Sequence, residues 1–352
     1  MNNDRPVRLG IIGCGSWAMA VAEAIKRSKK TELITCFDII TGNSINLSKK
    51  YTCDHEASLE DLLTRNDIEA VIVTSPNAVH AQHAVLSAQQ GKHVFVEKPI
   101  ANTLADGKKM VSACEKSGVV LMVGHYARRF AGMRQAKELL DEGKLGRPIM
   151  IEGNMSTNNG FALTPDKFRW RDDDSGCPSG PLMTQGVHLA DVFNHFFGPI
   201  ETAFSYFNKL YIAAEVPDVT MTIFQFRSGV LGYLGSNYVA PNTFWLYIYG
   251  TEANLLCTIP MPQAPSFDEY LKLVPLMDDN TNLQLMEKGK TEPRNIPVVI
   301  GDPMLEEIDE FAHCLRTGER PETDGPGALE ALALIRAAIE SVQTGQPVKV
   351  AV

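Results

Sequence analysis

The segment from Val7 to Ile25 constrains the fold of this chain more than any other. An apolar, β-branched run from Val7 to Ile12 leads directly into the sequence GCGSWA, residues 13–18, and an apolar-periodic stretch follows. This order predicts a strand, a glycine-rich turn and a helix, the unit from which parallel α/β sheets are built. The turn has the pattern G-x-G-x-x-A, in which the first glycine permits the tight turn and the second lets a pyrophosphate approach the backbone.

The glycine turn and an acid further along together predict a dinucleotide site. The backbone of Gly13, Gly15, Ser16 and Trp17 would face the phosphates at the amino terminus of the helix. A strand expected from Leu33 to Phe37 ends on Asp38, 20 residues past the alanine of the turn, where an acid binds the ribose hydroxyls of adenosine. An aspartate there repels a 2′-phosphate and no arginine follows closely, so we expect NAD in preference to NADP. The alternative role for Asp38 is a helix cap or a turn residue.

Strands and helices continue to alternate through the first third of the chain. Glycines end two of the expected helices, and Ser58 is a typical N-cap. Such alternation predicts a doubly wound parallel sheet, which we assign to a first domain spanning residues 1–124. The expected elements are a short helix from Ser58 through Leu63, strands at 70–73, 93–96 and 119–123, and helices at 79–90 and 103–117.

The strand that begins at His93 ends abruptly in Glu97-Lys98-Pro99. Pro99 cannot continue a sheet ladder, so the backbone must turn there and leave Lys98 at the carboxyl end of a buried strand. Ligands bind at that edge of open α/β sheets. Lys98 is therefore a candidate catalytic residue, although a lysine at a strand end is more often a solvated charge. His80 could likewise contact a ligand, but a histidine in the first turn of a helix is more often structural.

The pattern changes after residue 124. A helix to about Glu142 is followed by an extended stretch at 149–156, and residues from 202 to about 274 are rich in Phe, Tyr, Thr, Ile and Val without helical periodicity. Residues 228–229 and 250–252 are typical hairpin turns. We therefore expect an α+β second domain over residues 125–352 with a large, mostly antiparallel open sheet. Residues 278–296 are polar and expected to be an exposed excursion, and the two helices near the end could pack back on the first domain.

Two polar segments of the second half are candidate ligand contacts. Arg171, beside Trp170, is placed to meet an anionic or hydroxyl-rich ligand, whereas Arg169 is expected to be solvated. Further on, a helix is expected from Pro181 to Phe197. Thr184 and His188 are four residues apart and would share one face of this helix, with an aspartate three residues beyond. The alternative for His188 is a core histidine with one satisfied hydrogen bond.

Size and composition exclude several classes of protein. A chain of 352 residues is too long for one ordinary core, and a net charge of −9 disfavours nucleic acid and anionic membranes as partners. No apolar run has the length of a membrane span, and the start lacks the pattern of a secretory signal. The seven cysteines are scattered and never spaced as C-x-x-C. They predict free thiols in the cytoplasm and no metal site.

With these pieces placed, nearly the whole chain resembles the glucose–fructose oxidoreductase / inositol dehydrogenase / MocA (Gfo/Idh/MocA) family. The order and spacing of short motifs carry the resemblance together, since any one of them is modest. The motifs are the G-x-G-x-x-A turn, Ser75-Pro76-Asn77 with His80, Glu97-Lys98-Pro99, His125 to Phe130, Trp170-Arg171, Gly180 to Asp191, Gly250-Thr251-Glu252, and the ending from Arg316 to Pro347.

The resemblance implies a Rossmann domain that binds NAD(P), and oxidation or reduction of a sugar, polyol or related alcohol. It also implies homodimers or homotetramers joined through the open sheet of the second domain. In the family, the lysine matching Lys98 and the histidine matching His188 meet at the nicotinamide. Further cofactor contacts would come from Ser75, Pro76, Asn77, His80, Glu97 and Arg171, and further substrate contacts from His125, Arg171 and Thr184.

One position departs from the family pattern. Many members have an aspartate where this chain has Thr184, and that aspartate orients and charges the histidine. Thr184 offers only a neutral hydrogen bond, so we expect Lys98 to take the proton while His188 orients the substrate hydroxyl. Two alternatives stay open at this point: an enzyme that uses transient oxidation by NAD to cleave a glycosidic bond, and a non-catalytic NAD-binding regulatory protein.

Overall fold

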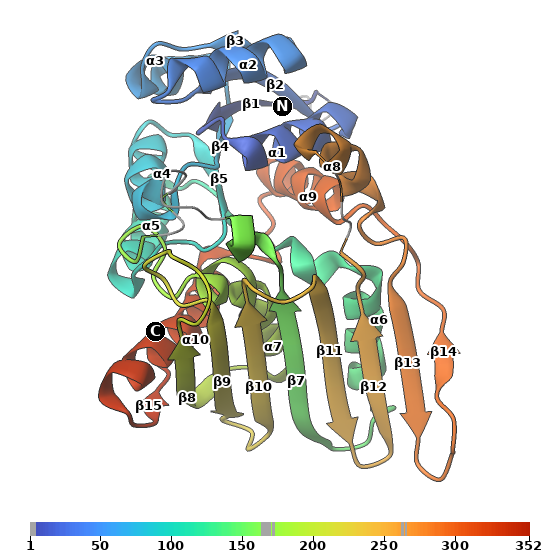
Figure 1. Cartoon of the computed structure of the whole chain (residues 1–352). Helices are drawn as coiled ribbons and strands as arrows, with labels where there is room; N and C mark the ends of the chain where they lie inside the picture. Colours follow the sequence, from blue (N-terminus) through green and yellow to red (C-terminus); the bar gives the residue numbers. More distant parts are fainter. Residues whose placement is uncertain (1–4, 163–169, 171–172, 262–263, 265) are drawn as a thin grey trace. The chain divides into compact units, whose positions relative to one another are not determined.

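The computed structural model describes residues 5–162, 170, 173–261, 264 and 266–352 (Figure 1). The backbone divides into two compact units. The first comprises Met1–His125, Gln263–Leu276 and Asp302–Ala328, and the second Tyr126–Pro262, Met277–Gly301 and Leu329–Val352. Two stretches that come late in the sequence therefore fold with the first unit.

A parallel sheet forms the core of the first unit, which confirms the doubly wound prediction. Its strand order is β3-β2-β1-β4-β5-β6, and every neighbouring pair is parallel. The order reverses between β1 and β4, so the loops that follow these two strands lie at the switch point where such sheets bind ligands. The strands are β1 (Val7–Ile12), β2 (Thr31–Phe37), β3 (Asp54–His55), β4 (Ala70–Val73), β5 (His93–Glu97) and β6 (Leu121–Gly124).

Helices cover this sheet and several begin at side-chain caps. Ser58 accepts a hydrogen bond from Asp61 N at the start of α3, as its sequence predicts, and Thr103 and Asp302 cap α5 and α9 in the same way. Helix α1 packs against α9, and α4 against α5. The helices of this unit are α1 (Ser16–Arg27), α2 (Thr41–Tyr51), α3 (Leu59–Thr64), α4 (His80–Gln89), α5 (Leu104–Ser117), α8 (Phe267–Leu273) and α9 (Pro303–Thr317), with 3₁₀ turns η1 (Asn77–Val79) and η7 (Val274–Leu276).

A nine-stranded sheet forms the second unit, in the order β14-β13-β12-β11-β7-β10-β9-β8-β15. All neighbouring pairs are antiparallel except β7 and β10, which confirms a large, mostly antiparallel open sheet. The strands are β7 (Pro148–Ser156), β8 (Ile200–Asn208), β9 (Val219–Phe226), β10 (Leu231–Asn237), β11 (Thr243–Gly250), β12 (Ala253–Thr258), β13 (Asn282–Glu287), β14 (Arg294–Ile296) and β15 (Val348–Lys349).

Among the described residues, helices pack on one face of this sheet and none covers the other face (Figure 1). Gly153 on β7 allows the close approach of α7, because a Cβ there would lie 2.9 Å from the ring of Phe193. We call the face without helices the outer face, and the alternation of side chains along each strand shows which residues lie on it. Along β9, Met221 and Ile223 are exposed while the residues between and beside them are buried. The other described elements of the second unit are η2 (Tyr126–Arg129), α6 (Ala131–Asp141), η3 (Asn159–Ala162), η6 (Leu182–Gly186) and α7 (Val187–Phe197), with α10 (Gly325–Thr344) running from the first unit into the second.

Two expectations from the sequence are wrong, and one helix was missed. Residues 278–296 are not an excursion but carry β13 and the edge strand β14, and along β13 the buried Leu283 and Leu285 alternate with more exposed residues. The stretch expected to be extended to about residue 274 contains the helix α8. Helix α2 was not anticipated, because it buries only Ser44 and Leu47 and so has little apolar periodicity. No helix of the described residues is apolar over a length that would cross a bilayer.

Candidate active site

The glycine turn after β1 lies directly against the loop after β4. Gly13 has φ +92°, and a Cβ there would lie 2.6 Å from the backbone nitrogen of Ser75, so only glycine fits. Thr74 Oγ1 donates to the carbonyl oxygen of Gly13 at 2.5 Å. Gly15 and Ser16 are exposed, and no atom lies within 4 Å of a Cβ built on Gly15. The amino terminus of α1 therefore presents open backbone N–H groups, as a pyrophosphate requires.

Asp38 is fixed to this turn by one carboxylate oxygen and to its own loop by the other. Its Oδ2 accepts from Cys14 N at 2.6 Å and its Oδ1 from Ile40 N at 2.7 Å. The backbone of the glycine turn and the Asp38 carboxylate are thus held together as one piece. The open cradle at Gly15 and a carboxylate anchored beside it fit the dinucleotide that the sequence implies.

His80 connects the loop after β4 with the turn after β5. Its Nε2 lies 2.8 Å from Ser75 O and its Nδ1 2.9 Å from Pro99 O, and the side chain is 1% exposed. Burial lowers the pKa of His80 to about 4, while the two carbonyl contacts act in the opposite direction. The His80 ring thus lies between the loop after β4 and the turn after β5, and in its neutral form it can donate to only one of the two carbonyl oxygens. Ser75 is held further by His83, whose Nδ1 lies 2.9 Å from Ser75 Oγ.

Lys98 is the one partly exposed side chain in the stretch from Val94 to Ile100. The peptide bond between Lys98 and Pro99 is cis. The backbone N–H of Lys98 donates to Glu97 Oε2 at 3.2 Å, and Glu97 itself is buried. Gly124 on the neighbouring strand makes room for this carboxylate, since a Cβ there would lie 3.0 Å from it. His125, which follows β6, is also buried.

In the second unit the helix expected from Pro181 has a different first turn. Residues Leu182–Gly186 form a π-helical turn, in which Val187 N donates to Leu182 O, and α7 continues from there. The extra residue in this turn means that Thr184 and His188 do not keep the α-helical spacing that the sequence predicts, and π turns of this kind are frequent at functional sites. His188 is buried, with its ring centroid 4.9 Å from that of Tyr126.

A buried ion pair holds the segment that carries Tyr126 to α7. Arg128 Nε donates to Asp191 Oδ2 at 2.5 Å and its Nη2 to Oδ1 at 2.7 Å, while Nη1 lies 3.3 Å from His195 Nδ1. Both partners are buried, and the paired contacts have the bidentate geometry that makes arginine–carboxylate bonds strong. Nothing in the sequence spacing pairs these residues, which are 63 positions apart.

The candidate residues divide between the two units. Lys98, Asp38 and the other nucleotide candidates lie in the first unit together with His125, and Thr184 and His188 lie in the second. Arg171 falls outside the described residues. Within the described part of the chain, no group of three or more His, Cys, Asp or Glu side chains is arranged to hold a metal ion.

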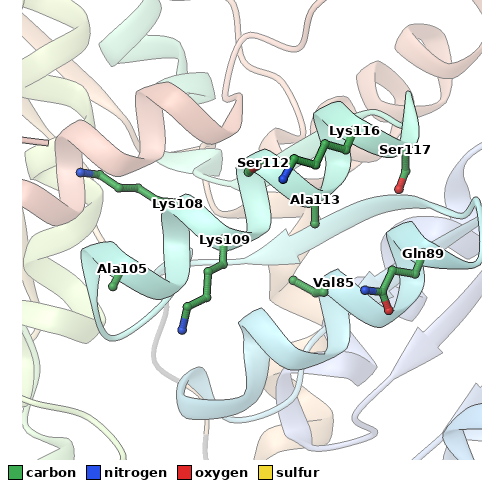
Figure 2. Close-up of a pocket in the computed structure, with 9 residues that line it drawn as sticks. All are labelled: Val85, Gln89, Ala105, Lys108, Lys109, Ser112, Ala113, Lys116 and Ser117. Atoms are coloured by element: carbon green, nitrogen blue, oxygen red, sulfur yellow. The ribbon is translucent and has the colours of Figure 1, made fainter.

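A separate hollow of about 600 Å³ lies between α4 and α5 (Figure 2). Three lysines surround it, and the apolar side chains of Val85 and Ala113 contribute to its lining. The residues that line the hollow are Val85, Gln89, Ala105, Lys108, Lys109, Ser112, Ala113, Lys116 and Ser117. The site residues predicted from the sequence are not among them. This hollow is therefore distinct from the candidate nucleotide site.

A parallel sheet with a glycine turn and an anchored acid at its switch point defines a Rossmann dinucleotide-binding protein, here joined to a unit built on an open sheet. Family models match both parts: an oxidoreductase family, NAD-binding Rossmann fold over residues 7–125, and an oxidoreductase family, C-terminal alpha/beta domain over residues 137–350. The chain thus belongs to the Gfo/Idh/MocA family of oxidoreductases, which confirms the resemblance drawn from its motifs.

Individual relatives extend the comparison. D-xylose 1-dehydrogenase [NADP(+)] of Haloarcula marismortui is 26% identical, over 98% of this chain and 94% of its own length. Glucose-6-phosphate 3-dehydrogenase of Bacillus subtilis is 32% identical, over 54% of this chain and 53% of its own length. A crystal structure described as that of an NADPH-dependent oxidoreductase from Desulfitobacterium hafniense is 32% identical over 98% of both chains, with a TM-score of 0.91. Levoglucosan dehydrogenase in complex with NADH, 19% identical over 98% of this chain and 99% of its own, shares the fold with a TM-score of 0.83.

Proposed function

We propose that this protein transfers a hydride between NAD and a hydroxyl-bearing carbon of a sugar or polyol. The observation that carries the proposal is the position of Lys98, a partly exposed amine at the carboxyl end of β5 that His80 links to the loop beside the phosphate turn. Relatives whose names specify sugars or polyols, among them inositol 2-dehydrogenase of Salmonella paratyphi B, 32% identical over 42% of this chain and 45% of its own length, support the substrate class.

The domain of residues 1–124 binds the nucleotide in this proposal, and residues 125–352 supply substrate contacts and the subunit interface. Gly13, Gly15, Ser16 and Trp17 hold the phosphates, and Asp38 binds the ribose. NAD is favoured over NADP because the Asp38 carboxylate would repel a 2′-phosphate, although one relative is named for NADP and one similar solved structure for NADPH. Ser75, Pro76, Asn77, Glu97 and Arg171 complete the contacts assigned to the cofactor.

The bound dinucleotide supplies the hydride acceptor, and the side chains of the protein handle the proton. Lys98 takes the proton from the substrate hydroxyl, acting as the general base. His188 orients that hydroxyl, because Thr184 cannot give it the charge that an aspartate would. Glu97 fixes the turn through the backbone N–H of Lys98 and so holds the amine at the strand end.

NADH formation over a panel of hexoses, inositols, glycosides and sugar acids, with NAD and with NADP, tests the proposal. Lys98→Ala should lose most of kcat on any substrate found while its affinity for NADH changes little. Lys108→Ala, at an exposed lysine on α5, is the matched control and should keep normal turnover. Near-normal turnover of the Lys98 variant would remove this residue from the chemistry. NAD binding without turnover of any alcohol would instead favour a regulatory protein.

We also propose that copies of the chain associate through the outer face of the nine-stranded sheet. This face has exposed Tyr206, Met221, Ile223 and Leu231 and a hollow of about 510 Å³ lined in part by Phe204, Ile223 and Tyr233. Apolar area of this kind marks an interaction surface, and closed symmetric dimers are its commonest use. The free thiols of all seven cysteines suit a cytoplasmic location.

A further inference from the structure

Tyr126 lies against the imidazole of His188 and connects it to a row of buried rings. The two ring centroids are 4.9 Å apart and the ring planes meet at 65°, which is an edge-to-face contact. Tyr126 also packs on Phe130 at 5.9 Å, and Phe130 packs on Phe244 of β11 at 5.7 Å. Each of these four side chains is at most 4% exposed. The His188 ring thus has an aromatic neighbour that the large sheet of the second unit supports.

Two buried carboxylates fix the segment that carries Tyr126. Asp191 on α7 accepts from Arg128 Nε and Nη2, as described above. Asp278, which is fully buried, accepts from the backbone N of Ala131 at 2.9 Å. Hydrogen bonds to ionised groups are among the strong ones in proteins, and the arginine pair adds a fixed geometry. The segment from Tyr126 to Ala131 therefore keeps a defined position on α7.

We propose that Tyr126 is a positioning residue for His188: its ring, held in place by the Arg128–Asp191 pair, keeps the imidazole in the orientation that meets the substrate hydroxyl. The inference rests on the proposed function for the role of His188. A histidine side chain can rotate about two bonds, and a close-packed neighbour restricts that rotation.

The residue at position 184 makes such support more important in this chain. An aspartate at that position would orient the histidine through a charged bond, whereas Thr184 offers only a neutral one. A reacting group that is misplaced by as little as an ångström loses much of its contribution to the rate. The edge of the Tyr126 ring supplies an orienting contact that does not depend on a charge at position 184.

The same contact could serve packing alone, and the other end of α7 offers a matched case. Phe226 of β9 is fully buried and packs on Phe197, with ring centroids 5.3 Å apart. Phe226→Leu therefore removes a ring that packs on the same helix, at a site nine residues past His188. Tyr126→Leu removes the ring beside His188, and Tyr126→Phe keeps it.

The kinetic test compares these variants on the substrate found in the NADH-formation screen. Tyr126→Leu should lower kcat about 10- to 100-fold and leave KM little changed, because the histidine is displaced while the rest of the site binds as before. Tyr126→Phe should keep most of the normal kcat, since the ring is retained. Phe226→Leu should lower Tm about as much as Tyr126→Leu does, but its kcat per folded protein should be normal.

A spectroscopic test needs no substrate. In protein with isotope-labelled histidine, the ring resonances of His188 are those that are missing from His188→Gln. Arg128→Lys keeps the positive charge but loses the paired bonds to Asp191, so the Tyr126 ring should move and shift the His188 resonances. Phe226→Leu should leave these resonances where they are.

Unchanged His188 resonances in Arg128→Lys would overturn the inference. Normal kcat in Tyr126→Leu would do so too, as would an equal loss of kcat in Tyr126→Leu and Tyr126→Phe. If Tyr126→Leu does not fold, the comparison of Arg128→Lys with Phe226→Leu decides. The two proposals fail separately. Shifted resonances without turnover of any alcohol would remove the oxidoreductase function alone, whereas turnover with unshifted resonances would remove the positioning role alone.

Discussion

His80 and Pro99 are joined by a contact of 2.9 Å between the histidine Nδ1 and the proline carbonyl oxygen. The other ring nitrogen of His80 lies against Ser75 O. A single buried side chain therefore sets the spacing between the loop after β4 and the turn that presents Lys98. A substitution of His80 should therefore alter the positions of both loops.

Replacing His80 should impair catalysis more than it impairs folding of the nucleotide turn. His80→Ala should lower kcat about 10- to 100-fold, because displacement of a catalytic amine by as little as an ångström has effects of that size. His83→Ala is the control, since His83 contacts Ser75 Oγ from the same helix. Steady-state kinetics on the substrate found in the screen, with NADH affinity measured by fluorescence, separates the two. Equal losses of kcat in both variants would contradict a link to Lys98.

The buried state of His80 should also make stability depend on pH. Its pKa is lowered from 6.5 to about 4 by burial, so between these values the unfolded chain binds a proton that the folded chain does not. The free energy of unfolding should therefore be fully maintained above pH 6.5 and fall as the pH is lowered towards 4. Between pH 6.5 and pH 4, the free energy of unfolding of His80→Gln should fall less than that of the unmodified protein, by up to about 3 kcal/mol. Urea unfolding at pH 7 and pH 4.5 measures the difference, and identical pH dependence in both proteins would refute the assignment.

Asp38 should decide the choice of cofactor. Asp38→Ser removes the carboxylate that accepts from Cys14 N and Ile40 N, so kcat/KM with NAD should fall about 10- to 100-fold while the ratio of NADP to NAD use rises. Asp38→Asn keeps a hydrogen-bond acceptor but removes the charge. It should therefore show most of the rise in the ratio of NADP to NAD use that is expected for Asp38→Ser. A cofactor ratio that does not move in either variant would exclude Asp38 as the discriminating residue.

Breaking the Arg128–Asp191 pair should be costly. Asp191→Asn removes the carboxylate charge that pairs with the buried guanidinium of Arg128 and should lower the free energy of unfolding by about 3–5 kcal/mol. Lys144→Met, which breaks the well-exposed pair with Glu142, should change it by less than about 1 kcal/mol. Denaturant unfolding of both variants gives the comparison. Similar small changes in the two would mean that the buried pair contributes no more than a surface one.

Association through the sheet can be tested with two isoleucines of nearly equal exposure. Ile223, 53% exposed, lines the hollow on the outer face, whereas Ile149, 52% exposed, precedes the hollow-lining Met150 on β7 and so points to the opposite face. Ile223→Lys should shift the protein towards monomer in sedimentation velocity experiments, and Ile149→Lys should not. A monomeric unmodified protein, or dissociation by both changes, would refute this interface.

Sequence reasoning succeeded where a local pattern has one physical solution. The β1 strand, its glycine turn and α1 form a single piece of chain, and Ser58 caps α3 through bonds to its own neighbours. The hairpin turns at residues 228–229 and 250–252 likewise join β9 to β10 and β11 to β12. Polar composition misled at β13, because a strand with one buried face needs apolar residues only at alternate positions.

The sequence by itself determined the two-part architecture, the dinucleotide turn, Asp38 and the strand-end position of Lys98, because each depends on residues within one strand–turn–helix unit. Only the tertiary structure decided which side chains His80 joins, that Arg128 pairs with Asp191, and that the ring of Tyr126 lies against that of His188. These contacts link residues far apart in the chain, and their distances depend on packing of whole elements. The π turn before His188 belongs with them, since a shift of one residue in a helix leaves no mark in the spacing of its apolar positions.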